Sequence, residues 1–169
     1  DLSTADRMMI QVPMFHCFGM VLSMTASMTH GTTMYPLPYF SPKPALACIH
    51  NEHITTFNGV PTMFIALMQH PDFEKTDFSY IRTGIMAGSP CPIKVMEEVV
   101  EKMHMPEICI TYGQTEASPA TTMSKTTDPI ELRCTTVGQS IFGVETKIVD
   151  PETGEEKTIV FCLTGTGYF

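Results

Sequence analysis

EICITYGQTE, residues 107–116, joins a short apolar segment to a loop of polar side chains. Residues 107–110 predict a buried strand, and similar apolar segments alternate with helical patterns over the first two thirds of the chain. Such alternation predicts βαβ units with right-handed crossovers in a mostly parallel sheet. The other predicted strands are residues 7–12, 32–35, 54–58 and 81–87, and the predicted helices are residues 19–29, 43–53, 62–70 and 93–105. We therefore expect an α/β fold.

The helix expected at residues 93–105 has the clearest amphipathic pattern. Its apolar positions recur at helical spacing on one face, and charged positions occupy the opposite face. The apolar set is Ile93, Met96, Val99, Val100 and Met103, and the charged set is Lys94, Glu97, Glu98, Glu101 and Lys102. We expect this helix to lie on the sheet, after a tight turn in which Pro90 and Pro92 restrict the backbone.

The pattern changes after Val137, where apolar and polar residues alternate. Residues 144–148 predict a strand, and the turn at residues 150–154 predicts a hairpin that returns through residues 158–161. We therefore divide the chain into an α/β part, residues 1–136, and the start of a β-rich subdomain, residues 137–169.

The loop that follows residues 107–110 carries side chains suited to a nucleotide. Open α/β sheets bind ligands at the carboxyl ends of their strands, where this loop begins. Tyr112 can cover an adenine, and Gly113 lets the backbone pass close to it. Thr115 can donate to a phosphate, and Glu116 can give a carboxylate oxygen to Mg²⁺. Taken singly, Tyr112, Gly113 and Thr115 are more often ordinary turn residues, and Glu116 is more often a solvated loop acid. The interpretation therefore depends on the whole string.

The composition excludes several classes of protein. The net charge is −8 with only 10 Lys and Arg, and these do not cluster, so we expect no nucleic-acid partner. The apolar stretch after Phe18 is interrupted by serines and threonines, so we expect a core helix rather than an integral membrane segment. The six cysteines are spread singly without CxxC spacing, which favours reduced thiols and a cytoplasmic protein, with the mitochondrial matrix as an alternative.

Four further segments carry a resemblance to a known family. They are PMFHCFG at residues 13–19, NGVPTMF at 58–64, RTGIMAGSP at 82–90 and TVG at 136–138. Together with YGQTE at residues 112–116, they resemble the adenylate-forming, or AMP-binding, superfamily. Within it, their sequences are most similar to those of medium-chain fatty acyl-CoA synthetases. The resemblance extends from about Leu2 to Gly154. It implies that the chain is the central part of the large N-terminal domain of such an enzyme.

The resemblance implies a two-step ligase. A carboxylate attacks the α-phosphate of MgATP to give an acyl-adenylate, and the thiol of coenzyme A then displaces AMP to give a thioester. ATP or AMP, Mg²⁺ and coenzyme A are therefore the implied cofactors and co-substrates, and a fatty or related carboxylic acid is the implied substrate. Aryl-CoA ligases and amino-acid adenylation domains are the alternatives within the superfamily.

The resemblance also implies roles for individual residues. Thr115 and Glu116 are the implied catalytic residues, and Glu116 is the implied Mg²⁺ ligand. The implied nucleotide site consists of Gly88, Ser89, Pro90, Thr111, Tyr112, Gly113, Gln114 and Thr115. The implied acyl pocket or thiol tunnel consists of Phe15, His16, Val60, Met86, Ala87 and Gly88.

Two histidine patterns indicate other chemistry only weakly. His16 precedes Cys17, but adjacent residues on a strand point to opposite faces, so we expect no Cys/His nucleophile pair. His50 and His53 have the spacing of metal ligands on a helix, yet the sequence offers no third ligand, so a solvated helix end is the better interpretation.

We expect the chain to be a fragment that is inactive alone. Three parts that the family needs are not found in it: a Ser/Thr/Gly-rich phosphate loop before Asp1, an aspartate for the ribose and a C-terminal lysine. The remainder of the parent ligase is therefore an expected partner, and a homodimer is an open alternative. After about residue 155 the sequence departs from the family pattern. A hypothesis of another class is a non-catalytic adenylate-binding module.

Overall fold

A mostly parallel sheet forms the centre of the molecule. The computed structural model describes residues 2–156, and within them seven strands form one sheet in the order β2-β1-β3-β4-β5-β6-β7. The strands are β1 (Arg7–Ile10), β2 (Thr33–Pro36), β3 (Thr56–Phe57), β4 (Thr83–Met86), β5 (Glu107–Tyr112), β6 (Thr122–Met123) and β7 (Gln139–Ser140). Pairing is parallel from β2 to β5, then antiparallel through β6 to β7. The predicted α/β fold is confirmed.

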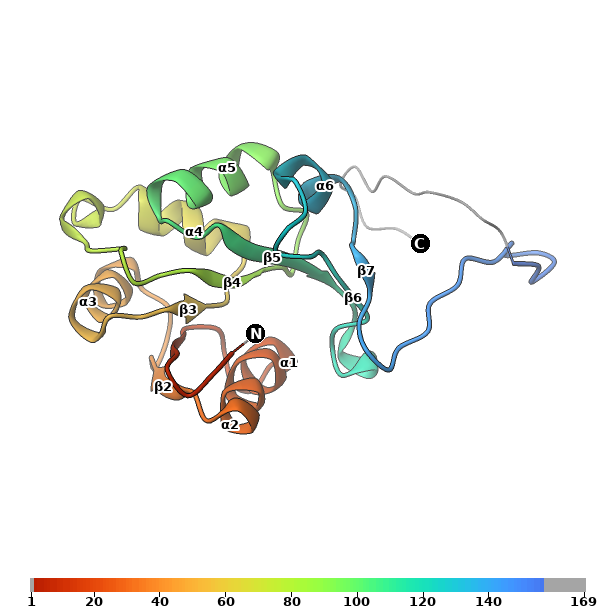
Figure 1. Ribbon diagram of the computed structural model, residues 1–169, viewed down its shortest axis with the longest axis horizontal. Helices are drawn as coiled ribbons and strands as arrows, with labels where there is room; N and C mark the ends of the chain where they lie inside the picture. Colours follow the sequence, from red (N-terminus) through yellow and green to blue (C-terminus); the bar gives the residue numbers. More distant parts are fainter. Residues whose placement is uncertain (1, 157–169) are drawn as a thin grey trace.

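Helices cover both faces of this sheet (Figure 1). One face carries α1, η1 and α2, and the other carries α3, α4 and α5. The bounds are α1 (Cys17–Gly19), η1 (Met20–Thr25), α2 (Ala26–His30), α3 (Pro42–Glu52), α4 (Pro61–Met68), η2 (Phe73–Lys75), α5 (Ile93–Lys102), η3 (Thr115–Ala117) and α6 (Ile130–Thr135). The main core lies between the sheet and α3, α4 and α5. None of the helices described for residues 2–156 has the length and apolar character needed to cross a membrane.

Helix α5 confirms the amphipathic prediction. Met96 and Val99 are fully buried in the core, while Lys102 pairs with Glu98 on the outer face at 3.3 Å. The helix ends at Lys102 rather than at residue 105, because His104 has a left-handed backbone with φ of +54° and Pro106 disfavours helical backbone at Met105.

The helix predicted at residues 19–29 is instead three consecutive pieces, α1, η1 and α2. The middle piece, η1, is π-helical. The Ser23 and Thr25 hydroxyls each donate to the carbonyl oxygen five residues earlier, at 3.2 and 2.9 Å. Side-chain bonds of this kind compete with the regular hydrogen-bond ladder of an α-helix, and they accompany the change of helix type here.

The strand predicted at residues 144–148 is wrong, since no strand covers these residues. The turn at residues 150–154 is present, because the Asp150 carboxylate accepts two backbone N–H groups and Val149 forms an isolated antiparallel bridge with Glu156. The expected return strand at residues 158–161 lies outside the described residues. Strands β6 and β7 were not predicted, because a strand of two residues is too short to show an alternating pattern.

Arg133 on α6 ties the antiparallel end of the sheet to β5. Its side chain is buried, and its guanidinium donates to the carbonyl oxygens of Pro106 and Ile108 at 2.9 and 2.8 Å and to that of Asp128 at 2.7 Å. Because backbone carbonyls satisfy the buried charge, Arg133 fixes the position of α6 on the strand that leads into the predicted loop.

A polar network joins four neighbouring strands at their amino ends. The Asp6 carboxylate, before β1, accepts from Thr55 at 2.8 Å and from the Arg82 guanidinium at 2.9 Å. Arg82 also donates to Glu107, the first residue of β5, at 2.7 Å. Burial raises the pKa of Asp6, but hydrogen bonds from Arg82, Thr55 and Ser3 lower it by more, so the pKa lies below its ordinary value.

We expect Asp6→Asn to lower the free energy of unfolding by about 2–3 kcal/mol at pH 7, because hydrogen bonds to a charged group are lost. Since the pKa of Asp6 is lowered in the folded state, its contribution is complete above about pH 4, the unfolded value, and is lost as the pH falls through the folded value. Urea unfolding at pH 7, 4 and 3 measures this change.

Lys75→Gln is the control, because Lys75 pairs with Asp72 at an exposed surface and should contribute less than about 0.5 kcal/mol. A difference between wild type and Asp6→Asn that stays constant down to pH 3 would contradict the assignment.

Candidate functional site

The candidate site lies at the carboxyl ends of the parallel strands, where the loops after β1, β3, β4 and β5 meet. The β1 and β5 loops touch through Cys17 and Thr115, whose Sγ and Oγ1 atoms are 3.4 Å apart. Gly59, after β3, pairs with Met86 at the end of β4. Figure 1 shows the loop after β5 on the same side of the sheet as α1.

Strand β5 runs two residues further than predicted, to Tyr112. The extension is stabilised by antiparallel pairing with β6, in which Thr111 faces Met123 and Tyr112 faces Thr122. The Thr111 hydroxyl donates to the Thr122 carbonyl at 2.7 Å, so this side chain stabilises the β5–β6 pairing. Tyr112 ends the strand with 41% of its surface exposed.

The start of the loop after Tyr112 packs closely against Pro119 and Ala120, where the chain returns toward β6. A Cβ at Gly113 would lie 1.8 Å from the Pro119 carbonyl oxygen, which no side chain could tolerate. The turn η3 then begins, with the Ala117 N–H donating to the Gln114 carbonyl at 2.9 Å. Gly113 is therefore required by the packing of the loop, independently of any ligand.

Three polar side chains of this loop face outward. Gln114, Thr115 and Glu116 are all exposed. Glu116 lies in the first turn of η3 with its side chain exposed to solvent. An exposed carboxylate suits a ligand to Mg²⁺, since this ion commonly takes one or two carboxylates together with water and substrate phosphates.

The loop after β4 is closed by a cysteine. Gly88, Ser89 and Pro90 are exposed, and Gly88 has a left-handed backbone with φ of +86°. The Cys91 thiol donates to the carbonyl oxygens of Met86 and Ser89 at 3.3 and 3.6 Å. Burial raises the pKa of Cys91 to about 12, so the thiol keeps its proton and remains a donor.

An apolar cluster separate from the main core adjoins these loops. Its members are Val12, Phe18, Leu22, Val60, Met63, Ile85 and Ala87. The structure thus brings together Val60 and Ala87 of the six residues predicted for the acyl pocket or thiol tunnel. Met86 packs instead in the main core, fully buried, because neighbouring residues of a strand point to opposite faces. Phe15 is 94% exposed.

His16 lies at the N-terminus of α1 rather than on a strand. Its Nδ1 atom accepts the backbone N–H of Phe18 at 3.1 Å and caps the helix. The Cys17 sulfur lies only 3.7 Å from this Nδ1 atom. The predicted separation of the His16 and Cys17 side chains on a strand is therefore wrong, because the backbone has already turned into the helix.

The weak metal interpretation of His50 and His53 gains no support. Within residues 2–156, no three His, Cys, Asp or Glu side chains group closely enough to hold a metal ion. The His50 Nδ1 atom accepts the Asp77 N–H at 3.1 Å, and the His53 ring lies 4.2 Å from that of Tyr80. Both histidines therefore have local structural partners.

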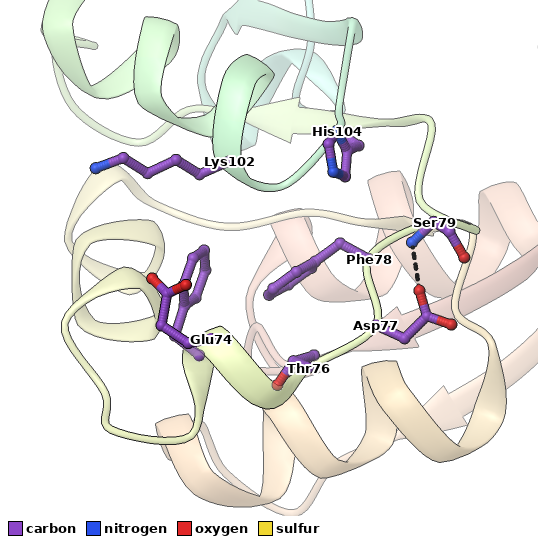
Figure 2. Close-up of a pocket in the computed structure, with 8 residues that line it drawn as sticks. Glu74, Thr76, Asp77, Phe78, Ser79, Lys102 and His104 are labelled. Atoms are coloured by element: carbon purple, nitrogen blue, oxygen red, sulfur yellow. Dashed lines mark hydrogen bonds between the residues drawn. The ribbon is translucent and has the colours of Figure 1, made fainter.

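A hollow of about 250 Å³ lies away from the loops of the candidate site, beside η2 and the end of α5. Figure 2 shows its polar side chains, with Asp77 accepting the Ser79 N–H at 2.9 Å. Lys102 on its rim pairs with Glu98. The hollow contains none of the residues predicted for nucleotide or acyl binding, so we assign it no ligand.

Comparison with known proteins identifies the family. The profile of the family described as AMP-binding enzyme matches residues 1–159. The chain belongs to this family. The expected resemblance to the AMP-binding superfamily is thereby confirmed.

The relatives are acyl-CoA synthetases by name. The chain is 49% identical over 155 residues to a Bacillus subtilis protein with the provisional name acyl-CoA synthetase YngI, covering 92% of this chain and 28% of that protein. It is 40% identical over 150 residues to the mouse medium-chain acyl-CoA ligase ACSF2, a mitochondrial protein, covering 88% of this chain and 24% of that protein. The chain thus spans less than a third of the length of either relative.

The fold has close counterparts among solved structures. The N-terminal domain of FACL13 from Mycobacterium tuberculosis superposes with a TM-score of 0.83 at 22% identity, covering 93% of this chain and 39% of that one. This likeness supports the α/β architecture of an acyl-CoA synthetase N-terminal domain.

Sequence reasoning missed the side chains that hold the loops in place. Cys91 clamps the loop after β4, the Asn58 side chain bonds to η1 and β4, and Cys17 contacts Thr115. Asn58 and Cys17 lie inside the motif segments, but nothing in a sequence shows which loop a side chain will meet. For Cys91, the only sequence feature that could have indicated a structural role was its position between Pro90 and Pro92, in a turn with restricted backbone.

We expect Gly113→Ala to lower the free energy of unfolding by about 1–3 kcal/mol, because the new Cβ forces the backbone away from Pro119. The neighbouring exposed residue provides a control, since Gln114→Ala should change stability by less than about 0.5 kcal/mol. Urea titrations of both variants make the comparison. Equal stabilities for the two variants would show that the close approach at Gly113 is absent.

Proposed function

We propose that the full-length protein containing this chain is an AMP-forming acyl-CoA synthetase. The observation that carries the proposal is the exposed string Tyr112 to Glu116 at the carboxyl end of β5, in a chain of the AMP-binding enzyme family. The reaction joins a fatty or related carboxylic acid to AMP, releases pyrophosphate, and then passes the acyl group to coenzyme A. The names of its relatives favour a medium-chain acid.

The nucleotide base would lie between the loops after β4 and β5. The Tyr112 ring is half exposed at the strand end and offers a face on which adenine can stack. Gly88, Ser89 and Pro90 would offer backbone groups to the edge of the base, and Thr111 its backbone beside the adenine amino group. The left-handed Gly88 lets this loop approach closely, since only a glycine adopts such a backbone without strain.

The triphosphate would lie over η3. Thr115 would donate a hydrogen bond to a phosphate oxygen, and Gln114 adds an exposed amide beside it. Glu116 would hold Mg²⁺, which when bound offsets the negative charge of the phosphates. Electrostatic positioning, rather than a protein nucleophile, would then lower the barrier to attack by the substrate carboxylate.

The acyl chain would lie against the apolar cluster beside α1. The half-buried Val60 after β3 and the buried Ala87 after β4 belong to this cluster, next to the exposed Gly88. Phe15 and His16 lie on the loop after β1 and would line the route of the coenzyme A thiol. Because Met86 packs on the other face of the sheet, its contribution would come through its backbone.

The cellular setting is also part of the proposal. The five cysteines of residues 2–156 are all free thiols, and burial raises the pKa of Cys48 and Cys134 to about 11. Protonated thiols react slowly with oxidants, which agrees with a reducing compartment such as the cytoplasm or the mitochondrial matrix. The partners would be the acid, ATP and coenzyme A, with a homodimer as a further proposal.

We expect Glu116→Ala in the full-length protein to slow ATP–pyrophosphate exchange by about two to three orders of magnitude, because a charge-stabilising group is lost. Exchange of labelled pyrophosphate into ATP in the presence of a medium-chain acid measures it. Glu101→Ala is the matched control, because Glu101 is an exposed acid on α5 and should leave exchange unchanged. An unchanged rate in Glu116→Ala would exclude the assigned role.

We expect Tyr112→Ala to raise the KM for ATP about tenfold or more, since stacking of a base on an aromatic ring is lost. Tyr112→Phe keeps the ring and should bind ATP as the wild type does. The comparison requires only steady-state kinetics at varied ATP. Equal KM values for the alanine and wild-type proteins would place the adenine elsewhere.

A further inference from the structure

We propose that Cys17 is a positioning residue for Thr115, which turns the hydroxyl hydrogen of Thr115 toward the phosphates of the nucleotide. The inference rests on the proposed function and adds a residue that lies outside the YGQTE string. It concerns the geometry of one hydroxyl group, since the Cys17 sulfur would touch neither substrate nor nucleotide.

The contact joins two loops that are distant in the sequence. Cys17 is the first residue of α1 and Thr115 the first residue of η3, and 98 positions separate them. Their Sγ and Oγ1 atoms lie 3.4 Å apart, within hydrogen-bond range for sulfur. Cys17 is only 8% exposed, whereas Thr115 is exposed, so the thiol supports the hydroxyl from the protein side.

The hydrogen bond of His16 affects which atom accepts the Cys17 thiol proton. The single lone pair of His16 Nδ1 accepts the Phe18 N–H at 3.1 Å. This nitrogen therefore carries no proton to give to the Cys17 sulfur, and it is a poor acceptor for the thiol at 3.7 Å. Thr115 Oγ1 is then the better acceptor for the thiol proton.

The direction of this bond determines what the Thr115 hydroxyl can do. A threonine hydroxyl has one hydrogen and two lone pairs. If Cys17 donates to a lone pair, the hydrogen of Thr115 is left for an outside acceptor such as a phosphate. If Thr115 instead donates to the sulfur, the hydrogen points into the protein. An anionic ligand favours the first arrangement, and the His16 Nδ1 atom, already occupied by the Phe18 N–H, does not compete for the thiol proton.

The test is a double-mutant cycle in the full-length enzyme, measured by ATP–pyrophosphate exchange. We expect Cys17→Ala to lower kcat about three- to tenfold, with the KM for ATP changed by less than about twofold, because one neutral hydrogen bond is lost. We expect Thr115→Val to lower kcat about tenfold or more. The double variant should be no slower than Thr115→Val alone, since Cys17 acts only through Thr115.

Two further variants separate positioning from packing. Cys17→Ser keeps a donor and should recover part of the activity lost in Cys17→Ala. Cys48→Ala removes a half-buried thiol on α3, far from the loops, and should retain the wild-type rate. Thermal unfolding of each variant identifies any loss of folded protein.

The outcomes are distinct. Coupling between the two positions, with recovery in Cys17→Ser, supports the inference. Independent, multiplicative losses, or full activity in Cys17→Ala, overturn it while leaving the proposed function intact. A wild-type rate in Thr115→Val overturns both the inference and the assigned role of Thr115. Absence of exchange in the wild-type enzyme with every acid tested overturns the proposed function itself.

Discussion

The buried amide of Asn58 is the interaction on which the candidate site depends. Its nitrogen donates to the Leu22 carbonyl and the Ser23 hydroxyl on η1, at 2.9 and 3.0 Å, and its oxygen accepts the Ile85 N–H on β4 at 2.9 Å. One side chain thus fixes the helical segment below the sheet against the strand that carries the Gly88 loop. An apolar residue there would leave several buried polar groups without partners, which costs more than the bonds themselves contribute.

The amino and carboxyl ends of the parallel strands differ in the side chains they carry. At the amino ends, Asp6, Arg82 and Glu107 form a charged network that joins neighbouring strands and faces no predicted ligand. At the carboxyl ends, polar side chains such as Gln114, Thr115 and Glu116 are exposed. This division follows from parallel pairing, because the carboxyl ends of all parallel strands lie at the same end of the sheet, where the loops that leave them can converge on a ligand.

The loops of the candidate site are held mostly by backbone contacts and thiols. Gly113 packs against the Pro119 carbonyl, the Cys91 thiol closes the loop after β4, and Cys17 reaches Thr115. Thiols fit such positions because they fill apolar space and still donate a weak hydrogen bond. A site held in this way presents a few polar side chains from a rigid frame, which suits catalysis by positioning of charge.

The sequence alone determined the α/β class, the amphipathic face of α5 and the string at residues 112–116, because periodicity and local turn chemistry are properties of neighbouring residues. Tertiary structure decided the rest. Pairing with β6 extended β5 to Tyr112, hydroxyl and amide bonds accompany the π-helical η1, and the turn at His16 brought Cys17 to Thr115. The β5–β6 pairing, the Asn58 bond to Ser23 and the Cys17–Thr115 contact join residues that are not neighbours in the sequence, so local sequence patterns do not predict them.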